Sequence, residues 1–282
     1  MKLLDTAFDS GIRHFDVAAM YGLGETEAEI GNFAFGRRDQ ITIATKFGLG
    51  VSRWVAPLAP YQDPARAVLE RLPKARRAVK TRADRPAPPR TYSAADAQTS
   101  LERSLRKLRT DYVDMFFVHD PRPDDDVRAD ELVDFFTTAK TAGKIRAWGV
   151  SQDAHPELPT LQRLGQSAVL QVRSDIFNDF VPGEPRITFG VMGRAYSRVL
   201  DAFQTDFTAR TRWSRELGLD LTHPEAIAHL LLDDALTVNR TGVVLYSTLN
   251  VERLRDTASR SNLHPDPAQV GRVRALIRHE LG

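Results

Sequence analysis

Cysteine is absent from the 282 residues of this chain. Its absence excludes disulfide bonds, thiolate metal sites and cysteine nucleophiles. A reducing compartment is therefore permitted, although it is not proved, and no metal site is predicted.

The chain also lacks long apolar runs and an excess of charge of one sign. No apolar run approaches the roughly 20 residues of a membrane span, and Asp5 and Asp9 interrupt the apolar core that a signal peptide would need. A net charge of +2 gives no overall case for a nucleic-acid partner. We therefore expect a soluble, cytoplasmic protein whose partner is neither a membrane nor a nucleic acid.

What the chain does contain is an alternation of strand-length apolar runs and helix-compatible segments. The clearest helix is predicted over 93–107, because Ser93 is a suitable N-cap with Asp96 three residues on. Strands are predicted at 12–17, 41–45, 112–118, 145–150, 168–172, 187–192 and 242–246. This alternation predicts an α/β fold of the (β/α)8 or TIM-barrel type, with 1–282 as a single domain.

The predicted barrel is one strand short. The chain opens on an amphipathic helix, 1–10, which Gly11 would end, so the first strand of the barrel is missing. We expect the strands at 12–17 and 242–246 to face each other across a gap, unless the native protein begins further upstream.

One long segment, at about 48–92, interrupts the alternation and is predicted to be an insertion. It is rich in Pro, Ala and Arg, and basic residues outnumber acidic ones between 66 and 90. The segment is either a solvated excursion with one short helix near 65–80, or a basic lid that attracts anionic substrates.

Polar residues follow the first three predicted strands where each strand ends. Asp16 lies near the end of the first strand, and Tyr21 follows that strand. Lys46 ends the second strand, and His119 follows the third. Because parallel strands end at one edge of the sheet, we expect these side chains to converge there. Taken singly, each has a structural alternative: an ion pair of Asp16 with Lys46, loop packing by Tyr21, and a satisfied structural histidine.

Several longer motifs together resemble the aldo-keto reductase family. They are GIRHFDVAAMYGLGETEAEIG, ITIATKFG, SLERSLRKLRTDYVDMFFVHDP, GKIRAWGVS and GVVLYSTLNVERLRDT, and they follow the family's order. The resemblance is to a divergent, shortened member that lacks the first strand and the N-terminal hairpin. It implies NAD(P)H-dependent reduction of an aldehyde or ketone, a class that includes sugar-like compounds, with a catalytic tetrad at Asp16, Tyr21, Lys46 and His119.

Elementary chemistry supports those four roles. A phenol has a pKa near 10 and is a reluctant acid, so we expect the Lys46 ammonium to stabilise the phenolate of Tyr21 and lower the pKa. Asp16 would keep Lys46 charged and in place. A neutral His119 would donate a hydrogen bond to the carbonyl oxygen of the substrate.

The resemblance also implies how the nicotinamide end of the cofactor is held. Ser151, Gln152 and Gln171 should bind the carboxamide, which needs both hydrogen-bond donors and acceptors. The family usually has Asn at the Gln152 position, so this part of the match is imperfect.

At the other end of the cofactor, the resemblance assigns Ser247, Thr248 and Arg253 to the adenosine phosphate. A guanidinium can bind a 2′-phosphate through two hydrogen bonds, which favours NADP(H), with NAD(H) not excluded. The alternative for Arg253 is a solvated helix residue.

A second hypothesis from another class is a catalytically weak or inactive relative that binds the cofactor in a regulatory role. The complete tetrad favours the enzyme, and the missing strand and altered cofactor positions favour the alternative. The sequence leaves the substrate and the oligomeric state open.

Overall fold

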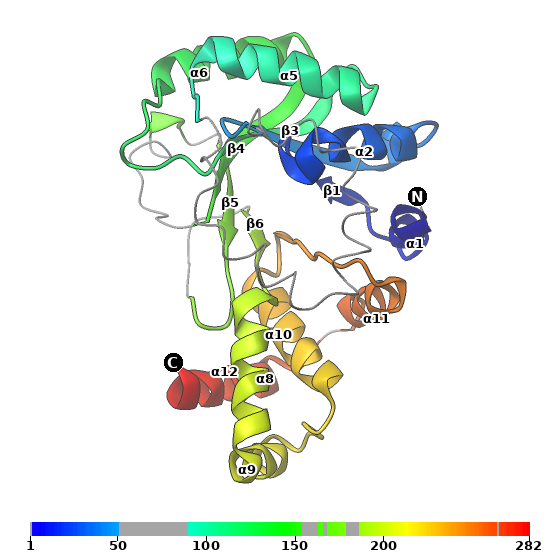
Figure 1. Ribbon diagram of the computed structural model, residues 1–282, viewed down its shortest axis with the longest axis vertical. Coiled ribbons are helices and arrows are strands. Elements are labelled where there is room, and N and C mark those ends of the chain that lie inside the picture. The colour runs from blue at the N-terminus through cyan, green and yellow to red at the C-terminus, as the bar shows by residue number, and fades with distance from the viewer. Residues whose placement is uncertain (1, 51–89, 154–162, 166–167, 179–185, 264) are drawn as a thin grey trace, which may run out of the picture. The chain divides into compact units, whose positions relative to one another are not determined.

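The computed structural model describes residues 2–50, 90–153, 163–165, 168–178, 186–263 and 265–282. The chain divides into two compact units, which contain mainly His14–Ser151 and Val169–Gly282, the latter together with Met1–Arg13 (Figure 1). We call them the β1–β4 unit and the β5–β7 unit after their strands. Most of the predicted insertion, with the short helix expected near 65–80, lies outside the described residues.

The β1–β4 unit contains a parallel sheet whose strands follow the order of the sequence. Its strands are β1 (His14–Asp16), β2 (Thr42–Phe47), β3 (Val113–His119) and β4 (Ile145–Gln152). Asp16 lies opposite Ala44, and His119 lies opposite Ser151. All four strands therefore end at one edge, as the sequence predicts.

Three helices pack beside this sheet in a row: α2 (Thr26–Ala34), α5 (Ala94–Leu108) and α6 (Ala129–Thr141) (Figure 1). Helix α5 begins with the predicted cap, since Ser93 Oγ accepts a hydrogen bond of 3.2 Å from the Asp96 amide. Helices α2 and α5 approach closely at Gly31, where a Cβ would lie 2.5 Å from the carbonyl oxygen of Lys107. A side chain at this position would push the two helices apart.

Aromatic side chains connect α6 to the sheet. Phe47 of β2 stacks on Phe116 of β3 with ring centroids 5.1 Å apart. Phe136 of α6 stacks on Trp148 of β4 at 5.7 Å. Stacked pairs at these separations add to the free energy that burial of the rings contributes.

A buried carboxylate joins the strands nearer their amino ends. Asp114 of β3 accepts hydrogen bonds of 2.8 Å from Arg38 and from Arg146, and one of 2.9 Å from the amide of Ile43. A buried charge is tolerated when hydrogen bonds and an opposite charge satisfy it, as they do here. This network holds β2, β3 and β4 together away from the edge where they end.

The β5–β7 unit contains a second run of parallel strands and most of the remaining helices. Its strands are β5 (Val169–Arg173), β6 (Arg186–Phe189) and β7 (Val243–Val244). Its helices are α1 (Lys2–Asp9), α8 (Gly193–Thr205), α9 (Phe207–Leu217), α10 (Pro224–Val238), α11 (Val251–Ser261) and α12 (Pro267–Leu281). Helix α1 packs against α11, and α8, α9, α10 and α12 share one apolar core.

Helix α9 was not predicted as a separate helix. Two of its apolar side chains, Trp213 and Leu217, are buried in the helical core, where Trp213 meets Phe203 edge-on at 4.9 Å. Asp206 caps the start of the helix, and Gly218, with φ 66°, ends it. Two buried residues are too few to produce a clear helical period in the sequence.

All seven predicted strands are present, with ends that shift by a few residues, and the α/β class is confirmed. In the part of the chain that the structure describes, β1 and β7 are the outer strands of their runs. They belong to different units, so the gap expected between them stays a prediction, as does the single domain over 1–282.

Candidate active site

The centre of the site is a buried ion pair at the carboxyl ends of β1 and β2. Lys46 is only 1% exposed, and its ammonium donates hydrogen bonds to Asp16 and to the carbonyl oxygen of Val17, the latter at 2.9 Å. Burial lowers the pKa of Lys46, and the neighbouring Asp16 carboxylate opposes that change. Two acceptors thus hold the amine of Lys46 at the edge of the sheet.

Tyr21 and His119 complete the group of four residues that the sequence singled out. Tyr21 begins a short 3₁₀ helix, Tyr21–Gly24, which follows the end of β1. The Lys46 ammonium lies 5.2 Å from the centroid of the Tyr21 ring, and the ring meets His119 edge-on at 5.9 Å. Tyr21 is 38% exposed, so a substrate could reach a phenol that has a cation behind it and an imidazole beside it.

The environment of His119 keeps its imidazole neutral. Burial, followed by the cations of Lys46 and Arg90, lowers the pKa of His119 to about 3. A neutral imidazole carries one N–H donor and one acceptor nitrogen. It can therefore donate one hydrogen bond without adding a positive charge to the site.

Two of the predicted cofactor residues, Ser151 and Gln152, end β4. Ser151 is buried, and its carbonyl oxygen accepts a hydrogen bond of 2.6 Å from the amide of Asp120. The side-chain nitrogen and oxygen of Gln152 are buried and have no hydrogen-bond partner among the described residues. An unsatisfied buried amide is costly, and a ligand that offers a donor and an acceptor would satisfy it.

Gln171 is buried at the middle of β5, opposite Ile187 of β6. It belongs to the β5–β7 unit, whereas the tetrad belongs to the β1–β4 unit. Tyr196, an aromatic residue that could stack on a nicotinamide, lies on α8 and packs against the helical core.

The residues predicted to bind the adenosine phosphate gather at the start of α11. Asn250 caps this helix by accepting hydrogen bonds from the amides of Glu252 and Arg253, at 2.8 and 3.0 Å. Thr248 Oγ1 accepts a hydrogen bond of 3.1 Å from the Asn250 amide, and Ser247 and Arg253 are exposed. The structure thus places Ser247, Thr248 and Arg253 together at a helix N-terminus, where an anion is favoured.

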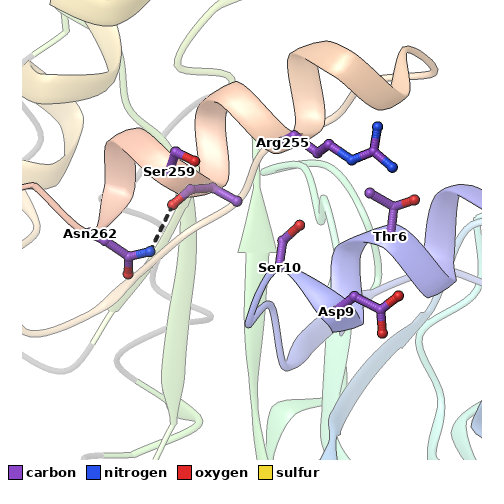
Figure 2. A pocket seen from close by; sticks show the side chains of 7 residues that line it. Thr6, Asp9, Ser10, Arg255, Ser259 and Asn262 are labelled. Carbon is purple, nitrogen blue, oxygen red and sulfur yellow. Dashed lines mark hydrogen bonds between the residues drawn. The ribbon is translucent and has the colours of Figure 1, made fainter.

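A polar hollow of about 490 Å³ lies between α1 and the later turns of α11. Figure 2 shows Arg255, Ser259 and Asn262 of α11 on one side of it, and Thr6, Asp9 and Ser10 on the other. None of the predicted site residues lines it.

The sequence did not identify three residues next to the tetrad: Arg90, Tyr92 and Asp125. Arg90 was assigned to the basic insertion, yet here it forms an ion pair with Asp125 at 2.8 Å and donates a hydrogen bond to the carbonyl oxygen of Asp120. The one sequence feature that could have indicated a partner for Arg90 was the acidic run at 124–126, which follows β3.

The described residues contain no group of three or more His, Asp or Glu side chains that could hold a metal ion. None of the helices seen in these ranges is long and apolar enough to cross a membrane.

Known proteins resemble this chain in sequence and in fold. Aldo-keto reductase YhdN of Bacillus subtilis is 28% identical over 179 residues, which are 63% of this chain and 44% of that protein. Aldo-keto reductase AKR11C1 from Bacillus halodurans has a TM-score of 0.70 at 18% identity, covering 98% of this chain and 86% of that one. An aldo-keto reductase from Klebsiella pneumoniae in complex with NADPH has a TM-score of 0.66 at 19% identity, covering 98% and 84%.

The structural likeness confirms the predicted barrel-type α/β fold. The chain spans less than half the length of the curated relatives that it matches. The model of the aldo/keto reductase family matches residues 1–182. Since this match covers more than half of the 282 residues, the chain belongs to the aldo-keto reductase family.

Proposed function

We propose that this protein reduces an aldehyde or ketone to the alcohol with NADP(H) as the hydride donor. The observation that carries the proposal is the buried Lys46–Asp16 pair behind the accessible phenol of Tyr21, with a neutral His119 beside it. Membership of the family supports the same reaction class.

In this proposal Tyr21 is the proton donor. A bound nicotinamide would supply the hydride for the carbonyl carbon. The Tyr21 hydroxyl would give its proton to the carbonyl oxygen as negative charge develops there. The Lys46 ammonium stabilises the phenolate that remains, and Asp16 keeps that ammonium in place. The N–H of His119 donates a hydrogen bond to the same oxygen and so polarises the carbonyl group.

The residues of the β4 end and of β5 would hold the nicotinamide. A carboxamide offers both a donor and an acceptor, and these match the unpartnered side-chain amide of Gln152. Ser151 and Gln171 would supply the further polar groups. Binding a carboxamide there would remove the cost of the buried, unsatisfied amide.

The start of α11 would hold the adenosine phosphate. Arg253 is exposed in the first turn, so its guanidinium can bind a 2′-phosphate, with Ser247 and Thr248 as further donors. A 2′-phosphate is present in NADP(H) and absent from NAD(H), and we therefore expect NADP(H) to bind more tightly. The NADPH complex of the Klebsiella pneumoniae protein supports this choice of cofactor.

The proposed reaction defines the substrate only as a small carbonyl compound, a class that includes sugar-like aldehydes. The phenol of Tyr21 is open to such a molecule, whereas Lys46 is covered. Neither a nucleic acid nor a membrane would take part in this reaction.

Two measurements on the purified protein test the proposal. A fluorescence titration should show that NADPH binds and that NADH binds more weakly. Oxidation of NADPH should then depend on added carbonyl compound in a panel of small aldehydes, ketones and aldoses. Binding without oxidation across the panel would favour the inactive, cofactor-binding alternative, and absence of binding would remove both hypotheses.

A further inference from the structure

The carboxyl ends of β2 and β3 are joined by side chains that belong to neither strand. The segment Arg90–Tyr92 crosses the ends of both strands, and Asp125 follows β3 in the sequence. We call Arg90, Tyr92 and Asp125 the strand-end clamp.

The clamp binds the backbone of β3 at His119 and at the residue after it. The Tyr92 hydroxyl donates a hydrogen bond of 2.8 Å to the carbonyl oxygen of His119. The Asp120 carbonyl oxygen accepts a hydrogen bond from the Arg90 guanidinium. Both carbonyl groups that flank the Cα of Asp120 are therefore held by the clamp.

Asp120 itself needs such support. Its φ is 47°, in the left-handed region that non-glycine residues rarely adopt. A residue in this region persists when surrounding contacts hold it. Besides the clamp, the amide of Asp120 donates its hydrogen bond to Ser151 of β4.

Asp125 fixes the orientation of Arg90. The Arg90 Nε lies 3.0 Å from both carboxylate oxygens of Asp125, and its Nη2 lies 2.8 Å from one of them. The backbone amide of Arg122 also donates a hydrogen bond of 2.7 Å to this carboxylate. Hydrogen bonds from Arg90 lower the pKa of Asp125, so the pair is charged, and the paired contact aligns the guanidinium plane.

Tyr92 of the clamp and the neighbouring Thr91 also contact Gly48, which follows the end of β2 two residues after Lys46. The Thr91 amide donates a hydrogen bond of 3.0 Å to the carbonyl oxygen of Gly48. The Tyr92 ring lies so close to Gly48 that a Cβ there would be 2.1 Å from the ring, and Gly48 has φ 106°. Only glycine meets both conditions, and the close contact places the Tyr92 hydroxyl against His119.

We infer that Arg90, Tyr92 and Asp125 are positioning residues, which hold the end of β3 so that the His119 imidazole faces Tyr21 and the reacting carbonyl oxygen. The inference rests on the role that the proposed function gives to His119. Tyr92 and Arg90 bind the backbone carbonyl groups of His119 and Asp120, so they act on the imidazole through the backbone. The cation of Arg90 also contributes to the low pKa of His119, which keeps the imidazole neutral.

The test combines four variants with two readouts. Tyr92→Phe keeps the ring against Gly48 and removes the hydrogen bond to His119. Arg90→Ala removes the ion pair, and Arg90→Lys keeps the charge without the paired geometry. Arg128→Ala is the matched control, because Arg128 also pairs with a neighbouring acid, Asp126, but lies exposed on the surface.

The readouts are the NMR signals of the His119 ring, assigned with a His119→Asn variant, and the kinetics of NADPH-dependent reduction. Tyr92→Phe and Arg90→Ala should shift or broaden the His119 signals and lower kcat by about 10- to 100-fold, as displacement of a catalytic group does. The Kd for NADPH should stay within about twofold of the wild type. Arg90→Lys should recover part of the loss, and Arg128→Ala should change neither readout.

Unchanged His119 signals in folded Tyr92→Phe would overturn the inference, and so would a loss of NADPH binding equal to the loss of kcat. If Arg90→Ala fails to fold, the result for Tyr92→Phe alone decides whether the clamp positions His119. If the wild type reduces no carbonyl compound, the proposed function fails. The NMR signals still decide whether the clamp positions His119.

Discussion

Two of the regions that carry predicted site residues are built in opposite ways. At the end of the β1–β4 sheet, Lys46 is buried and bonded to Asp16, and hydrogen bonds from the clamp hold the backbone beside His119. At the start of α11, Ser247 and Arg253 are exposed, and the Asn250 cap bonds the backbone.

The difference follows from what each region would do. A proton donor needs neighbours that favour its charged form, and burial strengthens such interactions. A phosphate-binding residue has to remain open to a ligand that arrives and leaves. In this account the β1–β4 region performs the chemistry and the α11 region supplies affinity, so substitutions in the two should separate turnover from binding.

The largest effect is expected from Lys46→Met. Loss of the ammonium removes the stabilisation of the phenolate, so kcat should fall by at least about 100-fold. The partly buried Asp16 carboxylate would be left without its cation. This unpaired charge should lower the free energy of unfolding by about 3 to 5 kcal/mol. Steady-state kinetics and urea denaturation measure the two effects.

Lys144→Met serves as the control for that variant, because Lys144 is exposed and lies directly before β4. It should change neither kcat nor the midpoint of denaturation. A folded Lys46→Met protein with wild-type kcat would remove Lys46 from the chemistry.

A smaller effect, confined to binding, is expected from Arg253→Ala. Loss of a charge-assisted contact to the 2′-phosphate should weaken NADPH binding by about 1.5 to 3 kcal/mol, or roughly 10- to 150-fold, and barely change NADH binding. Fluorescence titration with both cofactors measures this difference. Arg255→Ala, two residues along the same helix, should leave both affinities unchanged because Arg255 faces the hollow beside α1.

Equal losses of NADPH and NADH affinity in Arg253→Ala would contradict the phosphate assignment. They would instead indicate that the variant disturbs the start of α11.

The smallest effect, taken per pH unit, concerns the pH dependence of stability. The pKa of His119 is about 3 in the folded protein, against 6.5 for the unperturbed group. Between these values the unfolded chain binds a proton that the folded protein does not, so stability is lost as the pH falls below about 6.5. The contribution is up to about 1.4 kcal/mol per pH unit.

Replacing His119 with Asn removes this contribution. The free energy of unfolding of His119→Asn should therefore fall less steeply between pH 6.5 and 4.5 than that of the wild type. Parallel curves over this range would show that the His119 imidazole is not held in its neutral form.

The sequence predicted the regular part of this architecture well. Seven strands and the Ser93 cap of α5 have local signals, namely apolar runs and a capping pattern. The convergence of Asp16, Lys46 and His119 followed from one rule, that parallel strands end at the same edge.

What the sequence did not predict depends on long-range contacts. Tyr92 and His119 are 27 residues apart and Arg90 and Asp125 are 35 apart, and bonds between a side chain and a distant residue produce no periodic pattern. Arg90 therefore looked like the last charge of a basic stretch. The positive φ of Asp120 likewise has no signal in the sequence.

The most direct test of the account compares the wild type with Tyr21→Phe. The variant should bind NADPH with nearly unchanged Kd and reduce the best carbonyl substrate about 10²- to 10⁴-fold more slowly, because the proton donor is lost. Wild-type turnover by Tyr21→Phe on any substrate that the native protein reduces would contradict the account.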